Sequence, residues 1–461
     1  MTSAQIYGRA FRSVEATDGF APVTVEGAVP PDLRGTFWRN GPGQFELFGR
    51  PYRHWFDADG AVTAVRFADG GVRVASRLAE CPQLARERAA GRAIYASGQT
   101  RASWWRMVGG RGKAVRNINT LHWQGQTYAL AEGAMPIPID EATLASGTPR
   151  ALADDMASFH AHHRTDPRTG TVYGFGVEFG RTWGLSVYRL GADGRSARMV
   201  RIPLPDPRIL VHDIAFVGSA LVVLVHPIGL KLLPLMAGLK APLECLTWSP
   251  DAGSEVLVVP LADPAAFRRF SVPAFYHFHF GNGFVDGDRM HVDLCRMDWL
   301  DWEADFTLDA MRRGDLPSMQ PTRFARMSLR GEAMDLTLIS EAECEFPAID
   351  PRRAGVRHRY TWMVEGEHNI GQLARFDHET GRWARPPLGD SIFPGEPTLV
   401  PRGEAEDAVW VLAQAYDGER ERTGVVVLDG ARPEAPPVAR VWFPHHVPPA
   451  LHGSFVPAAP R

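Results

Sequence analysis

Residues 166–176 read DPRTGTVYGFG, a tight turn followed directly by a strand-like run. Asp166, Pro167 and Gly170 are turn formers, and the valine, tyrosine and phenylalanine that follow are types that strands prefer. The same pairing of a turn with a short apolar run recurs along the chain, and the repetition predicts an all-β protein. Other turns of this kind are DADG (57–60), ADGG (68–71), GADG (191–194) and VDGD (285–288).

The strand-like runs are short and spread along the chain, which favours many strands over long helices. They are Gly71–Leu78, Thr127–Leu130, Gly170–Phe175, Leu221–Val225, Glu255–Val259, Met290–Leu294, Ala408–Leu412 and Val425–Leu428. Two helices are expected, at Gln83–Ala90 and Ala304–Arg313. The 45 glycines and 37 prolines are distributed over all 461 residues, in keeping with this organisation. No fixed-period repeat is visible, so periodicity alone does not establish a propeller.

Composition and charge narrow the function classes. A net charge of −3 provides no basic field that would hold nucleic acid. The chain has four cysteines, namely Cys81, Cys245, Cys295 and Cys344. They lack metal-ligand spacing, and a chain of this length needs no disulfide framework. The first residues lack the apolar core of a signal peptide, and no apolar run is long enough to span a bilayer. We therefore expect a cytoplasmic protein without a spanning helix.

The stretch HPIGLKLLPLMAGLKAPLECL (226–246) is strongly apolar, with Lys231, Lys240 and Glu244 as its charged residues. Proline and glycine interrupt it, and it is too short to cross a membrane. Two interpretations stay open. It forms a buried lid over the core, or it is a patch that dips into one leaflet while its lysines reach the headgroups. The second interpretation places the protein at the inner face of a membrane.

Four of the sixteen histidines lie in apolar or aromatic surroundings, where an unpaired imidazole is costly. They are His162 in FHAHHRTDPRTG, His212 in LVHDIAFVG, His279 in FYHFHFGNGF and His452 in PPALHGSFVP. Their long spacing leaves two interpretations, a shared metal site or separate core histidines. The chain has no HExxH or CxxC motif, no GxSxG elbow, no P-loop and no GxGxxG.

Several motifs in a fixed order make the chain resemble the carotenoid cleavage oxygenase family from about residue 22 to 457. The series begins with PPDLRGTFWRNGPGQFE (30–46) and HWFDADGAVTAVRF (54–67), and it continues through DPRTGTVYGFG, VHDIAF, EFP, GEPTLVPR and LHGSFVP. The resemblance implies one seven-bladed β-propeller domain over residues 1–461. A few helices and long loops would form a cap over an iron site on its axis.

The same resemblance assigns the site residues. Fe(II) would be bound by His162, His212, His279 and His452. Register excludes His160, His163 and His277, of which His277 is the closest competitor because it shares a strand face with His279. Three glutamates are implied to orient the ligands, Glu132 for His212, Glu345 for His279 and Glu396 for His452. A carboxylate on the second nitrogen of a metal-bound imidazole fixes its tautomer and raises its basicity.

The chain departs from the family pattern at positions that bear on the substrate. His163 replaces a proline that commonly follows the first ligand, and Phe280 replaces a second histidine after the third. Pro449 and Ala450 precede Leu451 where an aromatic is frequent. Ala131 stands where the stilbene-cleaving branch has a lysine, which counts against a lignostilbene-type substrate.

The activity implied by the resemblance is an Fe(II)-dependent dioxygenase that uses O₂ to split a C=C bond of a carotenoid or apocarotenoid into two carbonyl products. Rival interpretations are an enzyme that cleaves stilbenoid or phenylpropanoid alkenes, an isomerase on the same iron site, and a lipid- or retinoid-binding propeller without catalysis. The sequence does not predict the oligomeric state.

Overall fold

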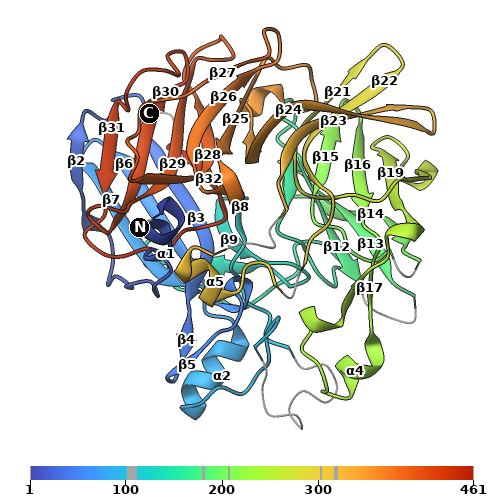
Figure 1. Ribbon diagram of the computed structural model, residues 1–461, viewed down its shortest axis with the longest axis horizontal. Coiled ribbons are helices and arrows are strands. Elements are labelled where there is room, and N and C mark those ends of the chain that lie inside the picture. Colours follow the sequence, from blue (N-terminus) through green and yellow to red (C-terminus); the bar gives the residue numbers. More distant parts are fainter. Residues whose placement is uncertain are drawn as a thin grey trace.

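Strands dominate the structure and the helices are short (Figure 1), so the prediction of a mostly β protein is confirmed. The structure, a computed structural model, describes residues 2–100, 112–178, 182–205, 208–301, 304–315 and 320–459. The colours in Figure 1 run around the molecule from blue through green and yellow to red, and the last strands lie beside the first.

Two five-stranded sheets bring the beginning and the end of the chain together. The first has the order β1 (Ala21–Pro22), β7 (Gly71–Leu78), β6 (Asp59–Ala68), β3 (Gly35–Gln44) and β32 (His452–Pro457). The second has the order β2 (Thr24–Gly27), β31 (Ala439–Trp442), β30 (Arg422–Asp429), β29 (Val409–Asp417) and β28 (Ile392–Pro401). Asn40 of β3 pairs with His452 of β32, so the last strand of the chain is held in register by one of the first.

Three smaller antiparallel sheets are formed by the strands between Asn119 and Val272. One consists of β10 (Ile137–Ile139), β9 (Gln126–Leu130) and β8 (Asn119–Trp123). The next consists of β11 (His163–Thr165), β12 (Val172–Glu178), β13 (Gly184–Leu190) and β14 (Ser196–Pro203). The third consists of β15 (Ile214–Val217), β16 (Ala220–Val225), β19 (Ser254–Pro260) and β20 (Arg268–Val272).

The largest sheet has seven strands, and its middle strand pairs with different neighbours along its length. Its order is β21 (Tyr276–Asp286), β22 (Arg289–Met297), β23 (Arg323–Arg330), β24 (Ala333–Ala348), β25 (Tyr360–Glu365), β26 (Gln372–Asp377) and β27 (Arg382–Ala384). Strand β24 pairs with β23 through Glu343 and with β25 from Cys344 onward. One long strand therefore serves two groups of strands.

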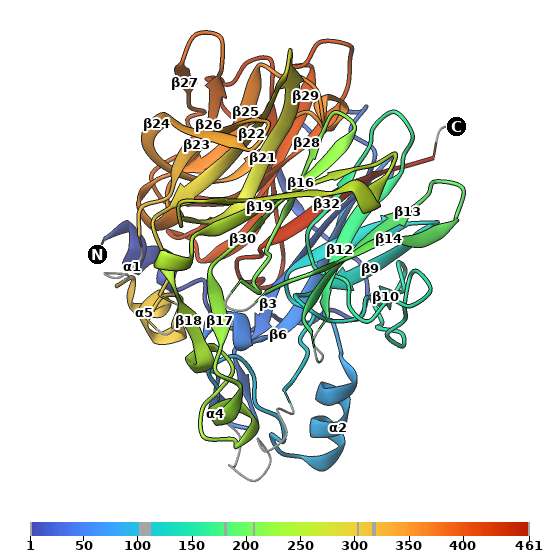
Figure 2. The ribbon, with the colours of Figure 1, turned by 90° about the vertical axis from the view of Figure 1, so that its right-hand side faces the viewer.

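Small elements lie at one end of the molecule (Figures 1 and 2). They are the hairpins β4 (Glu46–Leu47) with β5 (Arg50–Pro51) and β17 (Ile228–Leu230) with β18 (Leu246–Trp248), and the helices α2 (Pro82–Ala90) and α4 (Leu232–Met236). Helices α1 (Ser3–Gly8) and α5 (Leu308–Arg313) pack against each other elsewhere. Helix α2 confirms the helix predicted at Gln83–Ala90. Helix α5 confirms the helix predicted at Ala304–Arg313 only in part, because it begins at Leu308, after Thr307 has paired with His54 in a β-bridge. None of the described helices has the length and apolar character needed to cross a membrane.

Neighbouring sheets pack face to face through apolar side chains. Val65 of β6 and Val427 of β30 belong to one buried cluster, and Phe175 of β12 and Phe216 of β15 belong to another. Burial of each such side chain contributes about 1.5–3 kcal/mol. At the centre, the strands β11, β15, β21, β24, β28, β32 and β8 contact one another in this order. These inner strands carry the predicted site.

Candidate metal centre

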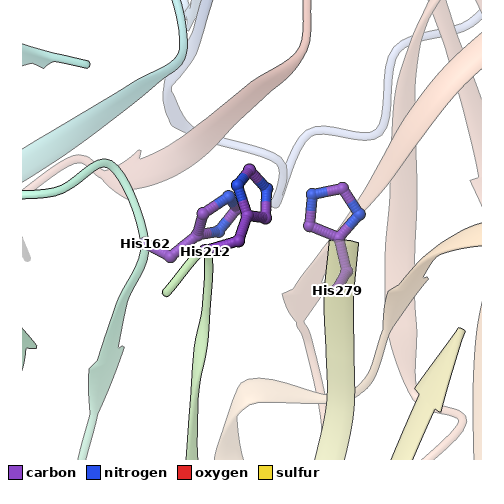
Figure 3. Close-up of side chains that lie close together, drawn as sticks. All are labelled: His162, His212 and His279. Carbon is purple, nitrogen blue, oxygen red and sulfur yellow. The ribbon is translucent and has the colours of Figure 1, made fainter. Parts of the chain in front are cut away.

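Four histidines that lie far apart in the sequence meet at the ends of inner strands. His162 immediately precedes β11, His212 lies two residues before β15, His279 is in β21, and His452 begins β32. Each of these strands is the edge strand of a different sheet. Figure 3 shows the rings of His162, His212 and His279 turned toward one another from three separate segments. The sequence alone left this convergence open.

The four rings are close enough to share one ion. Ligand nitrogens of His162, His212 and His279 all lie within 4.8 Å of one another. His452 completes the group, because its Nε2 lies 3.1 Å from Nε2 of His279 and its ring centroid is 4.7 Å from that of His162.

Two of the rings are held by carboxylates on their outer nitrogens. Nδ1 of His279 donates to Oε2 of Glu345 at 2.6 Å, and Nδ1 of His452 donates to Oε1 of Glu396 at 2.8 Å. A carboxylate only accepts, so the proton that each bond requires lies on Nδ1, and Nε2 of the neutral ring is then free to bind a metal. The two Nε2 atoms lie 3.1 Å apart, so one metal ion could be bound by both rings in their neutral form. Glu345 and Glu396 thus occupy the places expected for them.

The other two rings have looser partners. Oε1 of Glu132 lies 3.4 Å from Nδ1 of His212, while its Oε2 lies 2.6 Å from Nδ1 of His160. Glu132 therefore stands between two imidazoles and not on His212 alone. Nδ1 of His162 lies 3.8 Å from Oδ1 of Asp213. The sequence analysis missed Asp213, although its position directly after His212 could have pointed to it.

Electrostatics keep these imidazoles neutral or paired. Burial, helped by the neighbouring imidazoles, holds the pKa of His162 and of His212 well below the ordinary value. Burial also lowers the pKa of His452, although Glu396 opposes this. For His279 burial acts in the same direction, but the Glu345 carboxylate outweighs it and raises the pKa overall. Neutral imidazole is the form that binds a metal.

The donor set fits a transition-metal ion. Nε2 of His162 and Nε2 of His212 are buried and have no hydrogen-bond partner among the residues that the structure describes. An orphaned buried nitrogen calls for an explanation, and a metal at the shared point supplies one. A second cluster, Asp293 with His358 and His378, lacks this property. Its carboxylate already accepts two hydrogen bonds from Arg326, and both of its histidines hydrogen-bond to Thr361.

Register shifts in three strands set the direction of three site side chains. The register of β21 shifts between His277 and Phe280, and that of β24 shifts after Glu345. The register of β28 shifts between Pro394 and Pro397, on either side of Glu396. A bulge breaks the simple alternation of faces and redirects a side chain.

The register shift also separates His279 from its competitor. The ring of His277 is fully buried between His226, 5.0 Å away, and Phe280, 4.1 Å away. It is not among the grouped ligand nitrogens. His163 points elsewhere as well, with Nδ1 3.4 Å from the carbonyl of Ala161.

Arg39 is a second residue that the sequence analysis did not single out within the RNGP motif. It is buried, and it donates to Oε2 of Glu396 at 2.7 Å and to the carbonyl of Leu451 at 2.6 Å. Burial raises the pKa of Glu396, but His452 and Arg39 outweigh this and bring it to about 2. Arg39 thus fixes the ionised carboxylate and the backbone beside His452.

His212, His279 and His452 line a mostly apolar cavity of about 700 Å³. One end is lined by Leu232, Leu235 and Met236 of α4, and another by Tyr7 of α1 and Met311 of α5. Such a space suits an elongated apolar molecule placed beside the metal centre.

Segment 226–246 is not a fully buried lid. Leu233 is 85% exposed and Leu239 is 68% exposed, and Leu232 and Met236 are about half exposed while they also line the cavity. The segment is therefore both a wall of the cavity and an apolar surface.

Comparison with known proteins agrees with this architecture. The family described as retinal pigment epithelial membrane protein matches residues 11–457. The apocarotenoid-15,15'-oxygenase of Synechocystis is 30% identical over 457 residues, which cover 94% of this chain and 92% of that protein. The isoeugenol monooxygenase of Pseudomonas putida is 25% identical over 453 residues, 93% of each chain. The crystal structure of cobalt-substituted Synechocystis ACO has a TM-score of 0.90 at 29% identity and covers 99% of both chains.

Proposed function

Because the chain belongs to the retinal pigment epithelial membrane protein family, which includes the carotenoid cleavage oxygenases, we propose that it is an Fe(II)-dependent dioxygenase that cleaves a C=C bond of an apocarotenoid or carotenoid. The observation that carries the proposal is the meeting of four imidazoles beside a mostly apolar cavity, which three of them line. An apocarotenoid is preferred because the 30% identical relative is named for one.

The ligands in this proposal are His162, His212, His279 and His452. Bound there, Fe(II) would supply the activation of O₂. In the overall reaction the C=C bond breaks and each of its carbons receives one oxygen atom, so that two carbonyl products form without a further reductant.

The chain's own residues orient the ligands and the substrate, and they exclude water from the site. Glu345 and Glu396 hold the rings of His279 and His452 in one tautomer, with Nε2 toward the centre. Phe346 stacks on His279 at a centroid distance of 5.2 Å and covers one side of the site. The apolar cavity walls exclude water and hold one double bond beside the metal, which favours reaction at that bond.

The architecture supports a seven-bladed propeller as part of the proposal. Seven inner strands contact one another in succession, from β11 to β8. In this proposal the seven-stranded sheet counts as two blades, divided within β24 where pairing passes from β23 to β25. The inner strand of one blade is β21, and that of the other is β24. The whole chain then forms a single domain.

We also propose that the exposed leucines around α4 contact a membrane. Leu233 and Leu239 project apolar surface at the same segment whose other leucines line the cavity. A lipophilic polyene could then pass from the bilayer into the cavity without crossing water. Lys231 and Lys240 flank this surface and suit contact with headgroups.

Metal analysis and labelled oxygen test the oxygenase proposal together. Purified protein should contain about one iron per chain, and His212→Ala should lose most of it together with turnover of apocarotenals. His122→Ala is the matched control, because His122 is partly exposed, hydrogen-bonds to Thr127 and is not among the residues that line the cavity. Label from ¹⁸O₂ should enter both aldehydes. Retention of full activity by iron-free protein, or an unlabelled isomer as sole product, would overturn the proposal.

A second candidate substrate is a phenylpropanoid or stilbenoid alkene, which the 25% identical relative named for isoeugenol favours. Ala131, which lines the cavity without a polar group, counts against a phenolate anchor at that position. A turnover panel of apocarotenals and phenolic alkenes separates the two.

A further inference from the structure

Two charged side chains that line the cavity outside the metal centre, Asp57 and Lys113, are already engaged by the protein. Asp57 accepts hydrogen bonds from the backbone N–H of Gln99 and the hydroxyl of Thr100. Lys113 donates to Tyr52 and Asp59 and lies 2.8 Å from Glu87. Both side chains therefore already have partners within the protein.

The end of the cavity near α1 and α5 is different. Tyr7 of α1 lines it, and burial, with no hydrogen bond from a described residue contributing, raises the pKa of the Tyr7 hydroxyl. The ring is held in place, with Phe11 at 5.4 Å and Phe393 at 5.3 Å between ring centroids. A rigid phenol with an unused hydroxyl in an apolar wall is suited to bind a polar atom of a ligand.

His368 belongs to the same end. It lines the cavity, and its neighbour Ile370 also lines it and packs in one cluster with Tyr7. Nδ1 of His368 is buried without a hydrogen-bond partner in the described part of the chain. The backbone of His368 has φ 54°, in the left-handed region, which non-glycine residues adopt in only a few per cent of cases and histidine more readily than most. The turn from Gly366 to Ile370 therefore fixes the imidazole there at a conformational cost.

Aromatic rings complete this end. Trp55 packs edge-on against Phe11 at 5.5 Å, and Phe306 lies 6.2 Å from Trp55. Trp55 and Phe306 line the cavity. Helices α1 and α4 lie well apart in both Figures 1 and 2, so this end is not the one near the exposed leucines.

We infer that Tyr7 and His368 form a specificity site that hydrogen-bonds an oxygen atom at one end of the polyene, with the aromatic rings around it holding the adjoining ring or chain. The inference rests on the proposed function for its substrate class. The oxygen is a hydroxyl or a carbonyl, since both can accept from a phenol. A site built to pair an oxygen discriminates against the analogue that lacks it, because its own polar groups would stay unpaired.

Binding under anaerobic conditions tests this separately from cleavage. Three polyenes of equal length are titrated by quenching of tryptophan fluorescence: an apocarotenal with a ring hydroxyl, the same aldehyde without it, and a hydrocarbon without oxygen. Tyr7→Phe should weaken, by about tenfold, the binding of a ligand whose oxygen Tyr7 binds, and it should leave the affinity for the hydrocarbon unchanged. Loss with the first ligand alone identifies the hydroxyl, and equal loss with both aldehydes identifies the carbonyl. His368→Asn should act in the same direction, and asparagine tolerates the left-handed backbone.

Ile6→Val is the matched control, because Ile6 lies in α1 beside Tyr7 and packs in the same cluster without lining the cavity. It should change none of the three affinities. Equal loss of the hydrocarbon and the aldehydes in Tyr7→Phe, or no loss with any ligand, would overturn the inference. Absence of cleavage in air would instead count against the proposed function, while the anaerobic affinities would still decide this site.

Discussion

At the scale of single residues, the candidate centre depends on which nitrogen of each imidazole is occupied. Glu345 binds Nδ1 of His279 and Glu396 binds Nδ1 of His452, so Nε2 remains for a metal in both rings. Arg39 in turn holds Glu396. The precision of the site therefore comes from residues that would never touch the metal.

Replacement of Glu345 by glutamine should weaken metal binding by about 10- to 100-fold. Glutamine keeps the size of the side chain but loses the charge that makes the bond to His279 strong. The measurement is titration of metal-free protein with Co(II) or Fe(II). Glu341→Gln is the control, since Glu341 lies on the same strand with its side chain 84% exposed. Equal metal affinities in the two variants would contradict the role given to Glu345.

The sequence was sufficient to propose the site residues through their motifs, but not their detailed partners. Glu345 and Glu396 lie where the resemblance implied. Glu132 is shared between His160 and His212, and the carboxylate of Asp213 lies 3.8 Å from Nδ1 of His162. These differences depend on ångström-scale placement of side chains from separate sheets, which no local pattern encodes.

At the scale of elements, β-bulges limited how well the alternation of side chains along a strand could predict which face a residue occupies. A regular strand would place His277 and His279 on one face, yet the register shift in β21 sends only His279 to the centre. Short strands with clear turns were predicted well, and Gly71–Leu78 coincides with β7. The predicted start at Gly170 is two residues too early, because Gly170 has φ 67° and belongs to the turn before β12.

Helix α1 should depend on its contact with the end of α5. Gly314 has φ 62°, and a Cβ there would lie 2.3 Å from the backbone of Ala4 in α1. Gly314→Ala should therefore displace α1, lower the free energy of unfolding by about 1–3 kcal/mol and reduce hydrogen-exchange protection in α1. Gly331→Ala provides the control, since it has the same φ of 62° but no neighbour within 4 Å. Identical protection of α1 in both variants would refute the dependence.

The exposed leucines near α4 give a separate prediction. Leu233→Ser combined with Leu239→Ser should lower association with liposomes by about tenfold, because two largely exposed apolar side chains are lost without altering the cavity wall. Leu338→Ser, at a 40% exposed leucine on β24, should leave association unchanged. Flotation or sedimentation with vesicles measures the effect. If the double variant partitions like the parent protein, the membrane proposal for this segment fails.

At the scale of the whole molecule, long-range closure creates the site. The last strand, β32, pairs with β3 near the beginning of the chain, and the inner strands bring together histidines separated by up to 290 residues in the sequence, from His162 to His452. Spacing alone could not predict this, because the distance between two residues in such a fold depends on every sheet between them. The family resemblance supplied the missing topology.

The same deep burial makes the metal-free protein sensitive to acid. Burial lowers the pKa of His54 to about 4, although its bond to the carbonyl of Asp305 opposes this. Between pH 6.5 and 4 the unfolded chain then binds a proton at this residue that the folded chain does not, so stability falls as pH falls. Each such histidine contributes about 1.4 kcal/mol per pH unit. Asp57 acts oppositely, because burial raises its pKa to about 6.

His54→Asn isolates this term. Asparagine can still accept the hydrogen bond that the Phe56 N–H donates to Nδ1 of His54, but it does not titrate. The variant will be less stable at pH 7, since it loses packing. Between pH 7 and 5, however, its unfolding free energy should fall by about 2 kcal/mol less than that of the parent. Chemical denaturation of both metal-free proteins at the two pH values provides the measurement. Parallel losses would mean that His54 is already protonated in the folded state, contrary to its position in a fully buried site.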